Sequence, residues 1–210
     1  MAAFPNLCLF EHPLIHEKLA RARERATPTH EFRRLLSEIA GLMTFEVSRG
    51  FATREVTVET PLEKTRGRVL SQPITLVPIL RAGMAMTDGI LALIPEARVG
   101  HIGIYRDESS LEPHEYYAKF PADIAGGPVL LIDPMLATGG SARHAAQELK
   151  ARRCRDIRMI CLVAAPEGVR ALLEAHPDVM VYAACLDREL DERGYIRPGL
   201  GDAGDRCFGT

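Results

Sequence analysis

The stretch Thr138-Gly139-Gly140-Ser141 has the composition of an anion-binding loop. It follows the apolar run Val129–Ile132 and its terminal Asp133, and it leads into the helical pattern Ser141–Ala151. Backbone N–H groups are free at the positive end of a helix, and glycines let the chain approach an anion closely. The hydroxyls of Thr138 and Ser141 add further donors. The sequence therefore predicts a cradle for a phosphomonoester, with Asp133 as an acceptor suited to sugar hydroxyls. An ordinary strand-to-helix turn with a serine cap would use the same four residues, so these four alone leave both interpretations open.

The elements that must position this loop are visible as alternating apolar patterns. Runs of strand length are Pro73–Leu80, Val99–Tyr105, Val129–Ile132, Ile157–Ala164 and Val179–Cys185, and helical patterns are Glu31–Val47, Met84–Leu93, Ser141–Ala151 and Glu167–Ala175. Nearly continuous apolar strands that alternate with helices predict an α/β fold with a mainly parallel central sheet flanked by helices. Ligands bind beyond the carboxyl ends of such strands, where the sequence has Arg81, Arg106 and Asp133.

The last segment of the chain differs from the rest. Residues 187–210 contain five glycines and few apolar side chains. A long irregular segment in a compact domain is usually either frayed or functional, and its turn-forming residues favour function. With no linker in the sequence, we expect one domain over residues 1–210, with residues 187–210 as a C-terminal tail.

Composition and charge exclude several classes of protein. The chain has 210 residues and a formal net charge of −2, which gives no electrostatic case for nucleic acid or membrane as a partner. The basic runs Arg21–Arg25 and Arg152–Arg155 are interpreted as solvated helix faces. Five scattered cysteines without a C-x-x-C pair predict neither a disulfide framework nor a zinc site, and no leader or membrane-spanning run is present. We expect a reduced, cytoplasmic protein without a resident metal.

Longer motifs carry a family resemblance. Val129–Ser141 resembles the loop of type I phosphoribosyltransferases that binds 5-phospho-α-D-ribose 1-diphosphate (PRPP), and Pro134 in place of a second acidic residue is typical of the uracil phosphoribosyltransferases. Other stretches similar to that family are Val77–Gly83, Tyr105–Glu108 with Leu111–Pro113, Val163–Gly168 and Gly194–Arg206. The resemblance spans nearly the whole chain.

The resemblance implies a role for each matching residue. Arg81 and Arg106 would contact the diphosphate of PRPP. The ribose hydroxyls and the 5-phosphate would be held by the loop residues Asp133, Pro134, Met135, Leu136, Ala137, Thr138, Gly139, Gly140 and Ser141. Uracil would be bound by Ile196, Gly201, Asp202 and Ala203, with Asp202 also facing PRPP. Asp133, Arg106 and Asp202 would be the catalytic residues.

The implied activity is the transfer of a phosphoribosyl group to uracil, which gives UMP and diphosphate in pyrimidine salvage. Mg²⁺ would arrive bound to PRPP, since the sequence has no compact set of carboxylates for a dedicated site. Residues 187–210 would form a loop-rich C-terminal hood over the base site, and Arg106–Pro113 would form a lid that excludes water. The resemblance also implies a homo-oligomer and GTP as an effector, for which the sequence locates no site.

Two alternatives remain at this stage. One is a phosphoribosyltransferase with another base specificity, which the uracil-type tail disfavours. The other is a PRPP-binding regulatory protein of pyrimidine metabolism that binds RNA on the same fold. Such a regulator should carry a clustered basic face, which a net charge of −2 does not favour.

Overall fold

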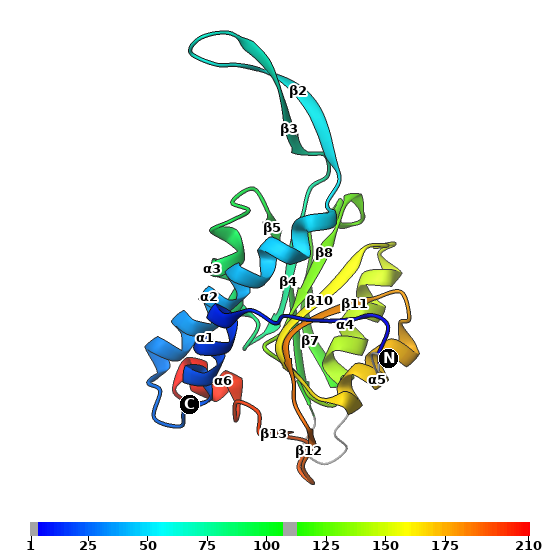
Figure 1. Cartoon of the computed structure of the whole chain (residues 1–210). Coiled ribbons are helices and arrows are strands. Elements are labelled where there is room, and N and C mark those ends of the chain that lie inside the picture. The colour runs from blue at the N-terminus through cyan, green and yellow to red at the C-terminus, as the bar shows by residue number, and fades with distance from the viewer. Residues whose placement is uncertain (1–3, 107–112) are drawn as a thin grey trace.

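The computed structural model describes residues 4–106 and 113–210, and a mostly parallel sheet with helices on both faces forms its centre (Figure 1). The sheet order is β1-β11-β10-β8-β4-β6-β7, with β5 beside β4 and β9 beside β10. All pairs along this order are parallel except β6 with β7, where β7 closes the edge in the antiparallel sense. The predicted fold class is confirmed.

The elements have the following bounds. The strands of the sheet are β1 (Leu7–Leu9), β4 (Thr75–Leu80), β5 (Arg98–Val99), β6 (His101–Arg106), β7 (Pro113–Lys119), β8 (Val129–Ile132), β9 (Met135–Leu136), β10 (Ile157–Ala164) and β11 (Met180–Leu186). Two separate hairpins are β2 (Thr53–Glu59) with β3 (Lys64–Leu70), and β12 (Glu189–Leu190) with β13 (Ile196–Arg197). The helices are α1 (Pro13–Arg23), α2 (Thr29–Val47), α3 (Met84–Leu91), α4 (Gly140–Ala151), α5 (Pro166–Ala175) and α6 (Ala203–Phe208), with short 3₁₀ turns η1 (Ser48–Gly50) and η2 (Ile124–Gly126).

Alternating side chains of the central strands feed two apolar cores. In β8, Leu130 and Ile132 pack with α1, α2, α3 and α6 on one face, whereas Val129 and Leu131 pack with α4 and α5 on the other. All four side chains are fully buried. Successive residues of a strand point to opposite faces, so a strand covered on both sides must be apolar throughout. For this reason the apolar runs Val129–Ile132 and Ile157–Ala164 of the sequence coincide with the observed strands β8 and β10.

The apolar run Val99–Tyr105 is divided at Gly100 into β5 and β6. A Cβ atom on Gly100 would lie only 2.9 Å from the ring of Phe120. The pairing with β4 changes at Gly100: β5 pairs with the start of β4, whereas β6 pairs with its end.

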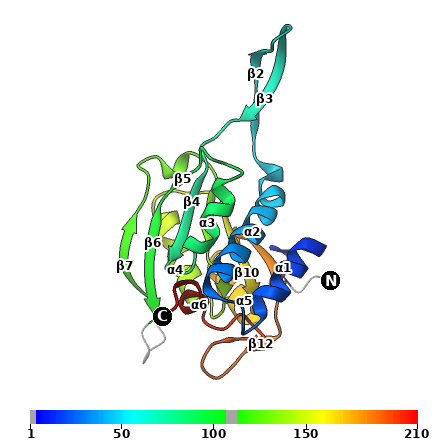
Figure 2. The same cartoon turned by 90° about the vertical axis from the view of Figure 1, so that its left-hand side faces the viewer.

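The hairpin β2–β3 is missing from the sequence prediction. It extends away from the body of the protein (Figures 1 and 2), and most of its residues are exposed. Its strands are rich in charged side chains and contain no apolar run, which is the signal that identifies the buried strands. In the described ranges, no helix combines the length and the apolar character that crossing a membrane requires.

Candidate functional site

The loop between β8 and α4 forms a pocket at the carboxyl edge of the sheet. This loop pocket is lined by Asp133 and residues 135–142. Gly139 precedes α4 with a φ of +80°, a left-handed conformation that favours glycine. The Thr138 hydroxyl accepts a hydrogen bond from the Gly140 N–H at 3.4 Å. The structure thus brings together the loop residues that the sequence singles out, at the amino end of a helix, where an anion is electrostatically favoured.

The loop is held in place by the first turn of α5. A Cβ atom on Gly168 would lie 2.3 Å from the Ala137 carbonyl oxygen, and one on Gly139 would lie 2.7 Å from the Gly168 carbonyl oxygen. Neither position has room for a side chain. Gly168 belongs to the stretch Val163–Gly168 that resembles the family, but the sequence assigns it no role. Its contact with the loop joins two segments about thirty residues apart in the chain, which local sequence does not reveal.

Asp133 lies at the tip of β8 with a perturbed carboxyl group. Its pKa is raised from the ordinary value to about 7, chiefly because burial disfavours the charged form. The charge of Asp202 acts in the same direction, and a 3.3 Å hydrogen bond from the Met135 N–H opposes the shift. The influence of Asp202 shows that the tail reaches this end of the sheet. A carboxyl group with such a pKa at the edge of a pocket is typical of a functional site rather than of a structural ion pair.

Asp202 begins helix α6 of the tail. Its Oδ1 accepts a hydrogen bond from the Asp205 N–H at 2.9 Å, so the carboxylate caps this helix. Asp202 therefore has a structural role at the turn that begins α6. Its exposed carboxylate also lies near enough to Asp133 to influence the pKa of that residue.

Arg81 follows β4 and is directed toward the tail. Its guanidinium is 3.2 Å from Asp205 Oδ1 and 5.7 Å from the centre of the Phe208 ring. The Leu80–Arg81 peptide bond is cis. A Cβ atom on Gly204 would lie 3.6 Å from this guanidinium and 3.2 Å from the Asp202 carboxylate, so Arg81 and Asp202 meet at the first turn of α6.

The remaining expected anion contacts fall largely outside the described residues. Arg106 ends β6, where its backbone pairs with Pro113 of β7. The side chains of these two residues, and the motif residues Asp107, Glu108, Leu111 and Glu112, lie outside the part that the structure describes. The lid expected over Arg106–Pro113 therefore stays a prediction.

A second pocket lies in the tail. This hood pocket is lined by residues 190–193, residues 195–198 and Gly201. Two of the expected uracil residues, Ile196 and Gly201, line it. Ile196 is 3% exposed as a whole residue and packs in the core with Leu200 and Ala203.

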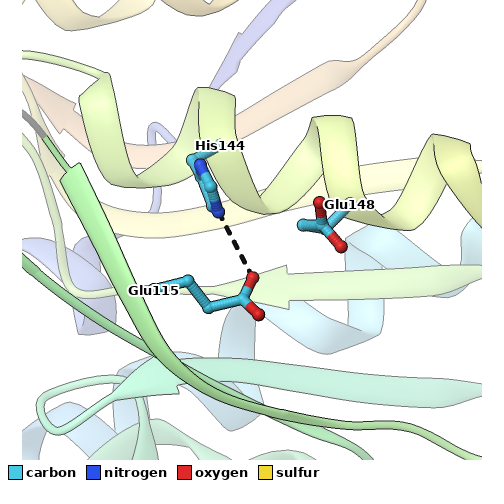
Figure 3. A group of neighbouring side chains, drawn as sticks. All are labelled: Glu115, His144 and Glu148. Atoms are coloured by element: carbon cyan, nitrogen blue, oxygen red, sulfur yellow. Dashed lines mark hydrogen bonds and ion pairs between the residues drawn. The ribbon is translucent and has the colours of Figure 1, made fainter.

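One group of possible metal ligands occurs among the described residues (Figure 3). Glu115 of β7 and His144 and Glu148 of α4 have ligand atoms within 4.8 Å of one another. His144 Nε2 is 3.2 Å from Glu115 Oε2, and Glu148 Oε2 is 2.6 Å from the guanidinium of Arg152. None of these residues lines the loop pocket. The contacts fasten the β6–β7 hairpin to α4, the helix that follows the loop pocket.

One minor expectation needs correction. Arg23 is not part of a solvated helix face: its guanidinium bonds to Asp187, whose side chain is only 4% exposed. Local sequence does not reveal which arginine of a charged run faces inward, because the partner is 164 positions away.

Comparison with known proteins gives a consistent result. The family model "Uracil phosphoribosyltransferase" matches residues 9–210. The uracil phosphoribosyltransferase of Lactococcus lactis subsp. cremoris is 57% identical over 203 residues, covering 95% of this chain and 96% of that protein. That of Enterococcus faecalis is 55% identical over 203 residues, covering 96% and 97%.

Solved structures agree on the fold. The AQ2163 protein of Aquifex aeolicus superposes with a TM-score of 0.94 at 36% identity, covering 97% of this chain and 98% of that one. A hypoxanthine-guanine phosphoribosyltransferase of Bacillus anthracis has a TM-score of 0.53 at 12% identity, covering 76% and 80%. The second likeness supports the fold alone.

The perturbed carboxyl generates a prediction about stability and pH. The folded protein binds the Asp133 proton more tightly than the unfolded chain does, since the pKa rises from 3.8 to about 7. Wild-type stability should therefore fall as pH rises through this window, and Asp133→Asn should be more stable than wild type at pH 8 by about 2–4 kcal/mol, but not below about pH 4. Its activity should be strongly reduced.

Thermal unfolding at both pH values measures this difference. Asp123→Asn is the matched control, because a hydrogen bond from Arg98 lowers the pKa of Asp123, so its loss should not stabilise the protein. An Asp133→Asn protein that unfolds earlier than wild type at pH 8 would show that Asp133 is a structural residue.

A second prediction concerns the contact between the loop and α5. Alanine in a helix is ordinarily favoured over glycine by roughly 0.5–1 kcal/mol. Gly168→Ala should instead destabilise the protein by about 1–3 kcal/mol, because its methyl group would displace the backbone of Ala137. Denaturant unfolding checks this, with Gly50→Ala as the control, since nothing lies within 4 Å of a Cβ atom there. Equal or greater stability of Gly168→Ala would contradict the close packing.

Proposed function

The chain belongs to the uracil phosphoribosyltransferase family, and we propose that the loop pocket and the C-terminal hood, residues 187–210, carry out the reaction of that family. In this reaction uracil and PRPP give UMP and diphosphate. The observation that carries the proposal is the convergence of the anion-binding loop, the raised pKa of Asp133 and the tail at one edge of the sheet. The relatives described above are named for the uracil enzyme, and they give no support to an RNA-binding regulator or to another base specificity.

The loop binds the phosphate end of PRPP. Backbone N–H groups near Gly139 and Gly140, together with the hydroxyls of Thr138 and Ser141, receive the 5-phosphate in the loop pocket. Because α5 packs directly against the loop at Ala137 and Gly139, these donors are held in position before PRPP binds. Preorganised donors of this kind lower the barrier without reorganisation during the reaction.

Asp133 holds the ribose. Its carboxylate accepts hydrogen bonds from the ribose hydroxyls and favours the positive charge that develops on the ring as diphosphate departs. A single partly buried carboxylate beside an anion cradle fits a Mg²⁺ ion that is bound mainly through substrate phosphates. Mg²⁺ supplies charge neutralisation for the diphosphate when it is bound. Arg81 and Arg106 are proposed to hold the departing diphosphate, for which a permanently charged guanidinium is suited.

The hood recognises the base. Ile196 and Gly201 line the hood pocket; Gly201 has only backbone to offer, and Ile196 packs in the core. Uracil presents an acceptor, a donor and an acceptor in sequence, and fixed backbone groups cannot rotate to suit the different pattern of cytosine. We propose that this backbone, with Asp202 and Ala203, reads the base.

A prediction about base choice tests the proposal. Uracil should be used with a kcat/KM at least about 10³-fold above that of cytosine, because a hydrogen-bonded site rejects mismatched donors and acceptors. Ile196→Val should keep this preference, since the side chain does not read the base. UMP formation from uracil and PRPP measures the rate, with cytosine, orotate and purine bases as comparisons. Use of cytosine within tenfold of uracil, or relaxed choice in Ile196→Val, would contradict the proposal.

We also propose that the protein is a homo-oligomer. The β2–β3 hairpin is separate from the main sheet and exposes the apolar side chains Val58, Leu62, Val69 and Leu70, with Leu62 94% exposed. An isolated two-stranded hairpin is at best marginally stable in water, so a second copy of the chain is the partner expected to cover it. GTP as an effector and a cytoplasmic location rest on the sequence and the resemblance, and they stay predictions.

The oligomer leads to its own prediction. The mass in solution should be a multiple of the 23.1 kDa chain, and replacing both Leu62 and Val69 by glutamate should shift it toward the monomer. Light scattering after size exclusion measures the mass. A monomeric wild type, or an unchanged assembly in the double variant, would refute this part of the proposal.

A further inference from the structure

An ion pair fastens the hood to the first helix of the chain. The guanidinium of Arg23 donates to both carboxylate oxygens of Asp187, at 2.9 and 2.7 Å, and to the Gly199 carbonyl oxygen at 2.8 Å. Asp187 also accepts a hydrogen bond from the Gly199 N–H at 2.8 Å. Both backbone polar groups of Gly199 are therefore held by one salt bridge.

This pair is largely removed from water. The Asp187 side chain is 4% exposed and that of Arg23 is 23% exposed. Burial by itself would raise the pKa of Asp187, but the hydrogen bonds from Arg23 and Gly199 hold it below its ordinary value, so the carboxylate is charged at neutral pH. Buried ion pairs are often no more stabilising than apolar residues of similar size, because desolvation offsets their attraction. What a bidentate pair adds is a defined geometry.

A second arginine ties the same segment from the opposite direction. Arg206 of α6 donates to the carbonyl oxygens of Ala22 and Leu200, at 2.7 and 2.8 Å, and to that of Glu24 at 2.7 Å. Gly199 and Leu200, which directly precede the expected uracil residues 201–203, are thus both bonded to arginines. The end of α1 and this part of the hood form one rigid unit.

Gly199 connects the anchor to the other part of the base site. It has a φ of +65°, and a Cβ atom there would lie 2.2 Å from the Ile196 carbonyl oxygen. This close approach to Ile196, and the separation of only two residues from Gly201, tie the position of Gly199 to two residues that line the hood pocket.

We infer that Asp187 and Arg23 are positioning residues for base recognition: they fix the backbone of Gly199, and through it the uracil-binding backbone of Ile196 and Gly201. Neither residue lines the loop pocket or the hood pocket. The inference rests on the proposed function, because it assigns the hood pocket to the base. It predicts a larger effect on uracil than on PRPP, since the loop expected to bind the 5-phosphate packs against Gly168 of α5 rather than against Arg23 or Asp187.

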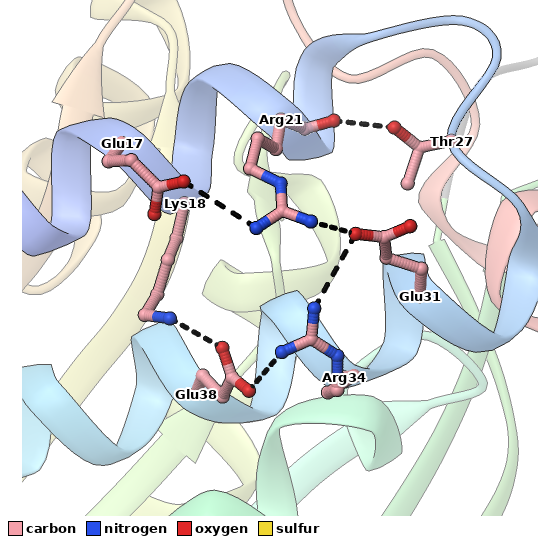
Figure 4. A network of polar contacts seen from close by, with 7 residues as sticks. All are labelled: Glu17, Lys18, Arg21, Thr27, Glu31, Arg34 and Glu38. Carbon is pink, nitrogen blue, oxygen red and sulfur yellow. Dashed lines mark hydrogen bonds and ion pairs between the residues drawn. The ribbon is translucent and has the colours of Figure 1, made fainter.

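Two variants and one control test the inference. Asp187→Asn keeps an acceptor for the Gly199 N–H but removes the charge opposite Arg23. Arg23→Lys keeps the charge but removes the two-pronged contact and its reach to Gly199. The control is Arg21→Gln, two residues earlier in α1, because Arg21 belongs to a surface network with Glu17 and Glu31 between α1 and α2 (Figure 4).

The measurements are the KM of uracil, the KM of PRPP and kcat, taken well below the thermal midpoint of each variant. Both anchor variants should raise the KM of uracil by about tenfold or more, since small displacements of positioned groups are costly, while the KM of PRPP changes by less than about threefold. Arg21→Gln should leave all three constants at their wild-type values.

Equal increases in both KM values, or an unchanged KM of uracil in a folded anchor variant, would overturn the inference. If Asp187→Asn does not fold, Arg23→Lys decides by the same comparison. The proposed function fails separately: a wild-type protein that forms no UMP from uracil and PRPP refutes it, whereas an active wild type with an unaffected anchor variant refutes only the positioning role.

Discussion

The site depends on keeping the Asp133 carboxyl at the end of a strand whose other side chains are all buried and apolar. Burial there and, to a lesser extent, the nearby charge of Asp202 raise its pKa to about 7. The free protein therefore carries a carboxyl group that is costly to ionise, whereas hydrogen bonds from ribose hydroxyls and a nearby Mg²⁺ would favour its charged form. The two segments near this carboxyl group are each held in place: the loop packs closely against Gly168, and the hood is anchored through Gly199.

The central strands and the loop after β8 could be predicted, because their structure is encoded by residues close together in the sequence. β8 and β10 are continuous apolar runs because both faces of the sheet are covered, and their observed bounds are those of the runs. The anion-binding loop is recognisable because glycine, threonine and serine follow such a run directly. The carboxyl ends of parallel strands share one edge, so the clustering of Arg81 and Asp133 also follows from the order of elements along the chain.

The rest depends on contacts between distant segments or on partners outside the chain. Nothing local distinguishes Arg23, which turns inward to Asp187, from Arg21, which stays in a surface network. The β2–β3 hairpin lacks an apolar face directed at its own core. Asp202 is ambiguous from sequence because one carboxylate both caps α6 and influences Asp133, and only the fold brings these two functions together.

The most direct test of this account is the titration of the Asp133 carboxyl itself, followed by carbon NMR in the free protein and with Mg²⁺ and PRPP present, using Asp133→Asn to assign the signal. The account predicts that the carboxyl titrates near pH 7 in the free protein. Its pKa should then fall when Mg²⁺ and PRPP are bound together, because the ribose hydroxyls would donate hydrogen bonds to the carboxylate and Mg²⁺ would offset the charge of the phosphates. A carboxyl that titrates in the ordinary range of aspartate in the free protein, or one whose pKa does not respond to PRPP, would contradict it.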